Sequence, residues 1–74
     1  MITIKLYYKG SSEPASGYDV SLGFDSSWRG VTSRQSTNSN GEAHFDSDDG
    51  QGEVYVNGDK KYSGYLSGQV TVYV

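Results

Sequence analysis

A strict alternation of apolar and polar side chains runs through residues 18–24, YDVSLGF. Successive side chains of a β-strand point to opposite faces, so Val20, Leu22 and Phe24 are expected to face a core while Asp19 faces solvent. Such a period of two is typical of a strand with one buried face. This stretch therefore predicts a half-buried strand, and with it a fold built from sheets.

The same period recurs along most of the chain, between segments rich in Gly, Ser, Asn and Asp. Residues 38–41, NSNG, and Asn57-Gly58 favour the positive φ angles of tight hairpins. No segment has apolar residues at helical spacing, so no helix is expected. About seven short strands with turns between them predict one domain over residues 1–74, an all-β sandwich or small barrel. The other strands are expected at residues 2–9, 31–37, 42–45, 53–56, 60–66 and 69–74.

The core of this domain must be small, because the chain has 74 residues, 34% of them hydrophobic, and no cysteine. A domain of this size has little room for the deep cleft that most enzymes use. In the first strand, the alternation places Ile2, Ile4, Leu6 and Tyr8 together on one face. The predicted core comprises Val20, Leu22, Phe24, Phe45, Val54, Val56, Val70 and Val72.

The charge balance argues against several classes of partner. Six basic and nine acidic residues give a net charge of −3, the wrong sign for neutralising phosphates, so no nucleic acid is expected. No segment resembles a secretory signal, and no apolar run is long enough for a membrane span. We therefore expect no membrane association, and a cytoplasmic location if residues 1–74 are the full gene product. An extracellular location is expected if they are a module excised from a longer protein.

Residues 37–45, TNSNGEAHF, resemble a signature of carboxypeptidase-regulatory-like, transthyretin-like and Cna-B-like modules. Residues 13–22 and 52–58 resemble other strands of these modules. The resemblance implies a seven-stranded antiparallel β-sandwich of the immunoglobulin-like or prealbumin-like kind, with an accessory, structural or interaction role. It does not extend to the Lys–Asn isopeptide bond of Cna-B-like members, because no lysine with a matching buried asparagine is evident. One histidine is also too few for the purine-catabolising enzymes of the transthyretin-like group.

Candidates for catalysis and metal binding are few. His44 alternates with Ala43 and Phe45, so a solvated histidine is favoured over a catalytic base, and a very small hydrolase is the minor alternative. No catalytic residue and no cofactor is predicted. Residues 46–53, DSDDGQGE, resemble part of a calcium loop, but the later ligand spacing is wrong. A solvated acidic turn is favoured over a weak calcium site formed by Asp46, Asp48, Asp49 and Glu53.

Outward-facing aromatic residues are the main candidates for a binding surface. The alternation places Tyr7, Tyr55 and Tyr73 on the polar faces of their strands, and Trp28 lies in an expected loop. Planar rings on a sheet face stack against sugars or pack on a protein partner, although tyrosine is also simply a good strand former. The sequence therefore predicts a non-catalytic structural or interaction module with a protein or carbohydrate partner. A carbohydrate-binding module that uses these aromatic residues is the alternative.

The last segment, residues 69–74, is β-branched and uncharged, which suits a strand at an open sheet edge. Such an edge can accept a strand from another chain through main-chain hydrogen bonds. The resemblance implies that the first and last strands pair, which moves the open edge to residues 33–37 and sets Tyr7 beside Tyr73. Binding is therefore predicted through a sheet edge or an outer sheet face, in a monomer or weak homodimer.

Overall fold

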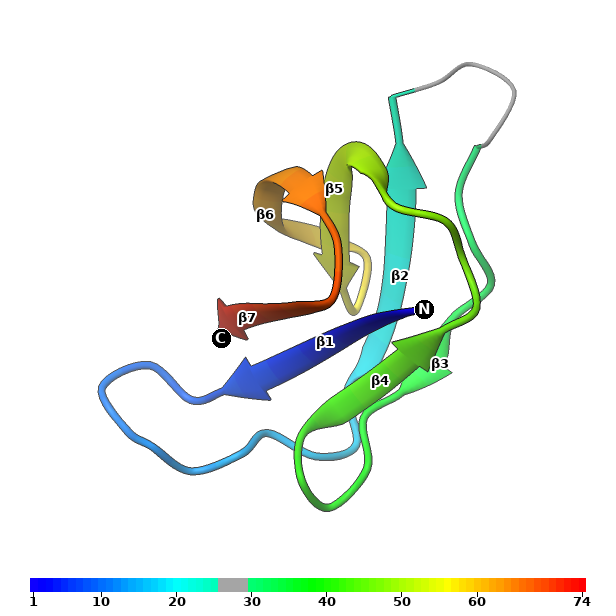
Figure 1. Cartoon of the computed structure of the whole chain (residues 1–74). Helices are drawn as coiled ribbons and strands as arrows, with labels where there is room; N and C mark the ends of the chain where they lie inside the picture. Colours follow the sequence, from blue (N-terminus) through cyan, green and yellow to red (C-terminus); the bar gives the residue numbers. More distant parts are fainter. Residues whose placement is uncertain (26–29) are drawn as a thin grey trace.

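The computed structural model describes residues 1–25 and 30–74, which form seven β-strands in two sheets (Figure 1). The three-stranded sheet has the order β4-β1-β7, and the four-stranded sheet has the order β3-β2-β5-β6. No helix occurs among the described residues, so the all-β prediction is confirmed. The strands are β1 Ile2–Tyr7, β2 Asp19–Phe24, β3 Gln35–Ser36, β4 Glu42–Phe45, β5 Gly50–Val56, β6 Asp59–Leu66 and β7 Gln69–Tyr73.

The first and last strands are neighbours, and they run parallel, with Ile4 opposite Val70 and Tyr7 opposite Tyr73. All the other strand pairs are antiparallel, so the expectation of a wholly antiparallel sandwich is wrong at this pair. A parallel pair requires a long connection between its strands. Here the connection is nearly the whole chain, which passes through the other sheet between β1 and β7 (Figure 1).

The chain turns at both predicted positions, but only Asn57-Gly58 forms the tight hairpin expected there, and the hairpin expected at residues 38–41 is wrong. Asn57 and Gly58 have φ angles of 51° and 89°, the positive values of a tight turn, and they join the hairpin β5-β6. In the other turn the Gly41 N–H donates to the Asn38 carbonyl oxygen (2.9 Å). This turn carries the chain from β3 in one sheet to β4 in the other. The sequence therefore identified the turn but not its passage between the sheets.

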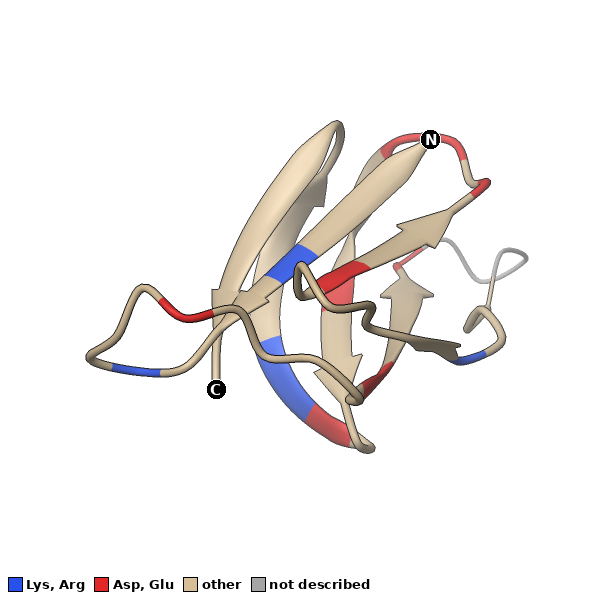
Figure 2. Ribbon diagram, turned by 90° about the horizontal axis from the view of Figure 1, so that it is seen from below, with Lys and Arg blue, Asp and Glu red and all other residues tan. Residues whose placement is uncertain are grey.

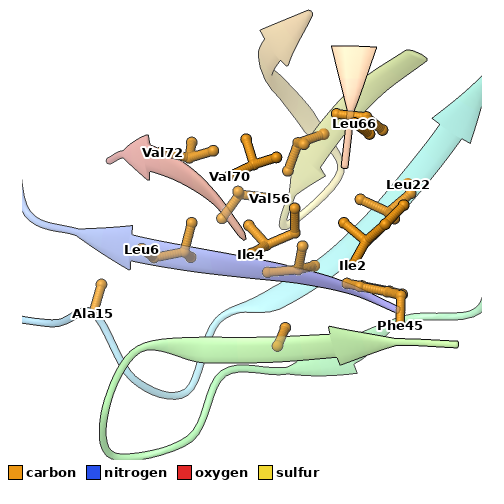
Figure 3. Packing of buried hydrophobic residues seen from close by; sticks show 13 residues of the cluster. Ile2, Ile4, Leu6, Ala15, Leu22, Phe45, Val56, Leu66, Val70 and Val72 are labelled. Atoms are coloured by element: carbon orange, nitrogen blue, oxygen red, sulfur yellow. The ribbon is translucent and has the colours of Figure 1, made fainter. Parts of the chain in front are cut away.

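The core lies between the two sheets, where thirteen of the described hydrophobic residues are buried (Figure 3). Seven of the eight predicted core residues are among them, whereas Phe24 is only partly buried. The placement of Tyr8 in line with Leu6 is wrong, because β1 ends at Tyr7. Tyr8 is 39% exposed and packs edge-on against Tyr18, with 6.1 Å between ring centroids. Buried residues beyond the predicted list are Ile2, Ile4, Leu6, Ala15, Ala43 and Leu66.

Several strand boundaries also differ from those expected. Residues 31–37 contain only the short strand β3 and an isolated bridge from Val31 to Gly23. Between them, the Leu22 N–H donates to the Thr32 hydroxyl (2.9 Å) in place of a backbone carbonyl. Strand β5 begins at Gly50 instead of Glu53, so the acidic loop is shorter than predicted. The pairing of β5 with β6 is irregular between Val54 and Tyr55, where β6 contributes an extra residue.

Thr37, the first residue of the TNSNGEAHF stretch, is buried, and its hydroxyl group both donates and accepts a hydrogen bond. Its hydroxyl donates to the Ala15 carbonyl oxygen (2.7 Å) and accepts the Tyr18 N–H (3.1 Å). A buried hydroxyl without partners is costly, so these bonds fix the loop before β2 against the end of β3. The loop of residues 8–18 is thereby held in place next to β1.

Candidate functional site

The outer face of the three-stranded sheet carries polar and aromatic side chains on all three strands. In β1 the residues alternate between buried and half-buried, so the odd-numbered side chains point away from the core. The same alternation in β7 leaves Val70 and Val72 buried and their neighbours exposed. We call this surface the outer face. It consists of Thr3, Lys5, Tyr7, Glu42, His44, Gln69, Thr71 and Tyr73.

Two of the predicted aromatic residues meet on the outer face. Tyr7 and Tyr73 lie directly opposite each other, with ring centroids 6.1 Å apart and planes tilted by 30°. The Lys5 ammonium group lies 5.5 Å from the centroid of the Tyr7 ring, within range of a cation–π interaction. Tyr73 is 53% exposed, so part of this pair is open to a ligand.

A shallow hollow of about 360 Å³ adjoins the tyrosine pair and is lined by Tyr7, Ser11, Ser12, Thr71 and Tyr73. Its serine side belongs to the loop of residues 8–18, which is braced by the Ser11 N–H donating to the Tyr8 carbonyl (3.1 Å). The hollow therefore combines two aromatic rings with three aliphatic hydroxyl groups. Sequence reasoning missed the serines, because the loop has no periodicity that would place them.

The remainder of the outer face holds a series of polar contacts between β1 and β4. Thr3 Oγ1 lies 2.9 Å from His44 Nδ1, and His44 Nε2 lies 3.7 Å from Glu42 Oε1. Lys5 Nζ lies 3.6 Å from the other oxygen of Glu42. Hydroxyl, imidazole and carboxylate follow one another here as in a catalytic relay. His44 is exposed, as predicted, and these four residues do not line the hollow.

Strand β7 is an edge strand of the three-stranded sheet, and only one side of its backbone pairs with a neighbouring strand, β1. The Val74 N–H donates to the Tyr7 carbonyl (2.9 Å), and the Val74 carbonyl accepts the Lys9 N–H (2.8 Å). Backbone groups of successive residues in a strand point to opposite sides, so alternate residues of β7 turn theirs away from β1. We call this side the β7 edge. Its outward-facing N–H and C=O groups belong to Gln69, Thr71 and Tyr73.

The other three sheet edges carry features that discourage strand addition. Strand β6 has Lys60 and Lys61 and an extra residue that disturbs its register. Strand β3 spans only two residues. In β4 the Glu42 carbonyl accepts the Asn38 N–H (3.0 Å), and the Glu42 N–H donates to the Asn38 side chain. Strand β7 has no charged residue (Figure 2), so it is the edge with the least protection among the described strands.

Two predicted aromatic residues do not join the tyrosine pair. Tyr55 lies on β5, in the other sheet, and its ring covers Gly23, where an added Cβ would come within 2.9 Å of Tyr55 Cε2. A ring that covers a glycine of the neighbouring strand supports the sheet. Trp28 lies outside the described residues.

The acidic residues proposed as a weak calcium site are not gathered into one. Among residues 1–25 and 30–74, no three His, Asp or Glu side chains are arranged to hold a metal ion. Glu53 lies on β5 and interacts with Asp25. A hydrogen bond with the Asp25 side chain raises the pKa of Glu53; desolvation and the Asp25 charge act in the same direction, and Lys60 opposes them.

This carboxyl pair predicts a pH-dependent effect of Glu53→Gln. A carboxyl group with a raised pKa stabilises the fold below its ordinary pKa of about 4.3, and the contribution is lost as the pH rises through the raised value. The glutamine amide can donate to Asp25 at every pH. We therefore expect Glu53→Gln to raise the melting temperature relative to wild type more at pH 7 than at pH 4. The same difference at both pH values, with Glu13→Gln as control, would contradict this assignment.

Within the part of the chain that the structure describes, no helix is long and apolar enough to cross a membrane. The sequence alternation correctly placed Tyr7 and Tyr73 on an outward face, and the structure adds their contact and the hollow beside them. No protein-family model, curated protein or solved structure significantly matches the chain.

Proposed function

We propose that this protein is a non-catalytic interaction module that binds an extended segment of another chain along the β7 edge. The observation that carries the proposal is the uncharged, unpaired side of β7, where three residues direct their N–H and C=O groups away from the sheet. A strand added there gains main-chain hydrogen bonds, and its alternate side chains provide selectivity. The outer face continues from this edge, so Tyr73 and Thr71 contact the same segment.

The absence of catalysis is part of this proposal. The Thr3, His44 and Glu42 side chains lie on an open sheet surface, away from the residues that line the hollow. Acyl transfer needs N–H donors aimed at a developing oxyanion. Beside these residues, Ile4 pairs with Ala43 of β4, and the Leu6 N–H donates to the Gly41 carbonyl oxygen (2.7 Å). We assign the Thr3–His44 contact to holding β1 and β4 together.

We also propose that the chain is a distant member of the carboxypeptidase-regulatory-like and transthyretin-like modules, with their prealbumin-like topology. Two observations support this. The TNSNGEAHF stretch forms the connection from β3 in one sheet to β4 in the other, with Thr37 bonded to Ala15 at its start. The first and last strands are neighbours in one sheet, as the resemblance implies.

Carbohydrate binding is the second candidate function, and the hollow favours it. Tyr7 and Tyr73 offer ring faces for stacking against a sugar, while Ser11, Ser12 and Thr71 offer hydroxyl groups for its polar edge. The hollow is shallow and open, so binding there is expected to be weak.

A titration followed by NMR distinguishes the two functions. Peptides selected for binding from a library of extended heptapeptides are expected to shift the amide signals of Gln69, Thr71 and Tyr73, and Thr71→Lys should abolish the shifts. Oligosaccharides acting at the hollow should instead shift the ring signals of Tyr7 and Tyr73. Tyr65→Ser is the control, because Tyr65 is 60% exposed on the other sheet. Peptide shifts confined to the β3-β2-β5-β6 sheet would refute the proposed function.

A further inference from the structure

We infer that the β7 edge pairs with the β7 edge of a second copy of this chain. The two strands run antiparallel, related by a two-fold axis at Thr71. This inference rests on the proposed use of the β7 edge for strand addition. It goes further by naming the partner, the strand direction and the register.

The backbone of the β7 edge is complementary to itself. The outward-facing groups belong to alternate residues, with Thr71 at the centre and Gln69 and Tyr73 placed symmetrically on either side. An antiparallel partner bonds through residues that exchange both N–H···O bonds across a pair. A two-fold axis at Thr71 places Thr71 opposite its own copy and Gln69 opposite Tyr73 of the second copy. Every outward-facing group of β7 then has a partner.

The side chains of this arrangement are compatible as well. Strand β7 has no charged residue, so its copies bring no like charges together despite a net charge of −3 on each chain (Figure 2). The nearest charges on the outer face, Lys5 and Glu42, form an ion pair (3.6 Å). Across the axis, Thr71 meets Thr71 of the second copy, which is a favourable cross-strand pair. The Gln69 amide meets the Tyr73 ring of the second copy without bringing like charges together.

The dimer would join the two three-stranded sheets into one sheet of order β4-β1-β7-β7-β1-β4. Because the axis is perpendicular to the sheet, both outer faces lie on the same side. Gln69 of the second copy borders the hollow next to Tyr73, so each hollow gains one wall from the other chain. A single short edge strand buries less than the roughly 1,000 Å² of a stable interface. Association is therefore expected to be weak, with a dissociation constant on the order of 10⁻⁴ M.

Single cysteine variants test the register directly, because the chain contains no cysteine of its own. The Cα atoms of an antiparallel hydrogen-bonded pair are about 5.5 Å apart, within the range that a disulfide spans. Thr71→Cys is therefore expected to form a disulfide dimer in a glutathione redox buffer. In the same dimer two Tyr73 residues lie about four residues apart along the strands, near 14 Å, too far for a disulfide.

We expect Thr71→Cys to cross-link about tenfold faster than Tyr73→Cys alone or the outer-face control Thr3→Cys. A mixture of Gln69→Cys and Tyr73→Cys should cross-link faster than either variant alone. Equal rates for Thr71→Cys and Thr3→Cys, with sedimentation showing only monomer at 1 mM wild type, would overturn the inference. If peptides still shift the Gln69, Thr71 and Tyr73 amides in that case, the proposed function stands and only self-pairing fails.

Discussion

Replacing Gly52 with alanine is expected to destabilise the fold by about 3 kcal/mol or more. Gly52 lies in β5 with strands on both sides, opposite Phe24 in β2 and Gly64 in β6. An added Cβ would overlap the Gly23 carbonyl oxygen and come within 3.1 Å of the Phe24 Cα atom. Both obstacles are backbone atoms of a paired strand, so no side-chain rotation relieves them. A domain of this size has a total stability of roughly 4–11 kcal/mol, and this loss is a large share of it.

Gly23→Ala is the matched control for Gly52→Ala. Its added Cβ meets the Tyr55 ring, which can rotate, so we expect a cost of about 1 kcal/mol. Urea denaturation followed by tyrosine fluorescence measures both variants. If Gly23→Ala costs as much as Gly52→Ala, the close approach of β2 and β5 at Gly52 is not what makes this position sensitive.

Phe45→Ala is the second change with a large expected effect, at about 3–5 kcal/mol. The Phe45 side chain is 4% exposed and lies opposite Ile2 at the end of the core nearest the N-terminus (Figure 3). Its removal forfeits buried apolar surface and leaves a cavity that the short strand β4 cannot close. Only thirteen of the hydrophobic residues that the structure describes are buried, so neighbouring side chains offer little compensation.

Tyr65→Ala provides the comparison for Phe45→Ala. This aromatic side chain is 60% exposed, and its loss is expected to cost less than about 1 kcal/mol. Thermal unfolding of both variants, measured by circular dichroism at the same pH, gives the difference. Similar midpoints for Phe45→Ala and wild type would mean that the packing between the two sheets is described wrongly.

The strands were predictable because alternation is a local property of the sequence. Which strands pair with each other depends on residues far apart in the sequence. Residues 18–24 and 69–74 show which side chains face inward, and the structure agrees at Val20, Leu22, Val70 and Val72. The parallel direction of β1 and β7 depends on how the chain passes through the other sheet, and no short stretch encodes that path. The turn at residues 38–41 was likewise visible as a turn, while its passage between the sheets was not.

The candidate site was predictable to a similar extent. Alternation placed Tyr7, Tyr55 and Tyr73 on outward faces, but it gives the face of a strand and not the sheet to which the strand belongs. The structure therefore separates Tyr55 from the other two. The contribution of Ser11 to the hollow depends on the conformation of an irregular loop. The need for glycine at position 52 follows from the close approach of the β2 backbone, which the sequence around Gly52 does not indicate.

Amide hydrogen exchange in β7 tests the claim that the β7 edge is open in the free chain and is the surface used for binding. In dilute solution the Gln69, Thr71 and Tyr73 amides should exchange quickly, whereas the Val70, Val72 and Val74 amides, which donate to β1, should be protected. A bound strand should then slow the exchange of the first three amides alone. Protection of all six amides in the dilute free chain, or fast exchange at Gln69, Thr71 and Tyr73 with the strand bound, would contradict the claim.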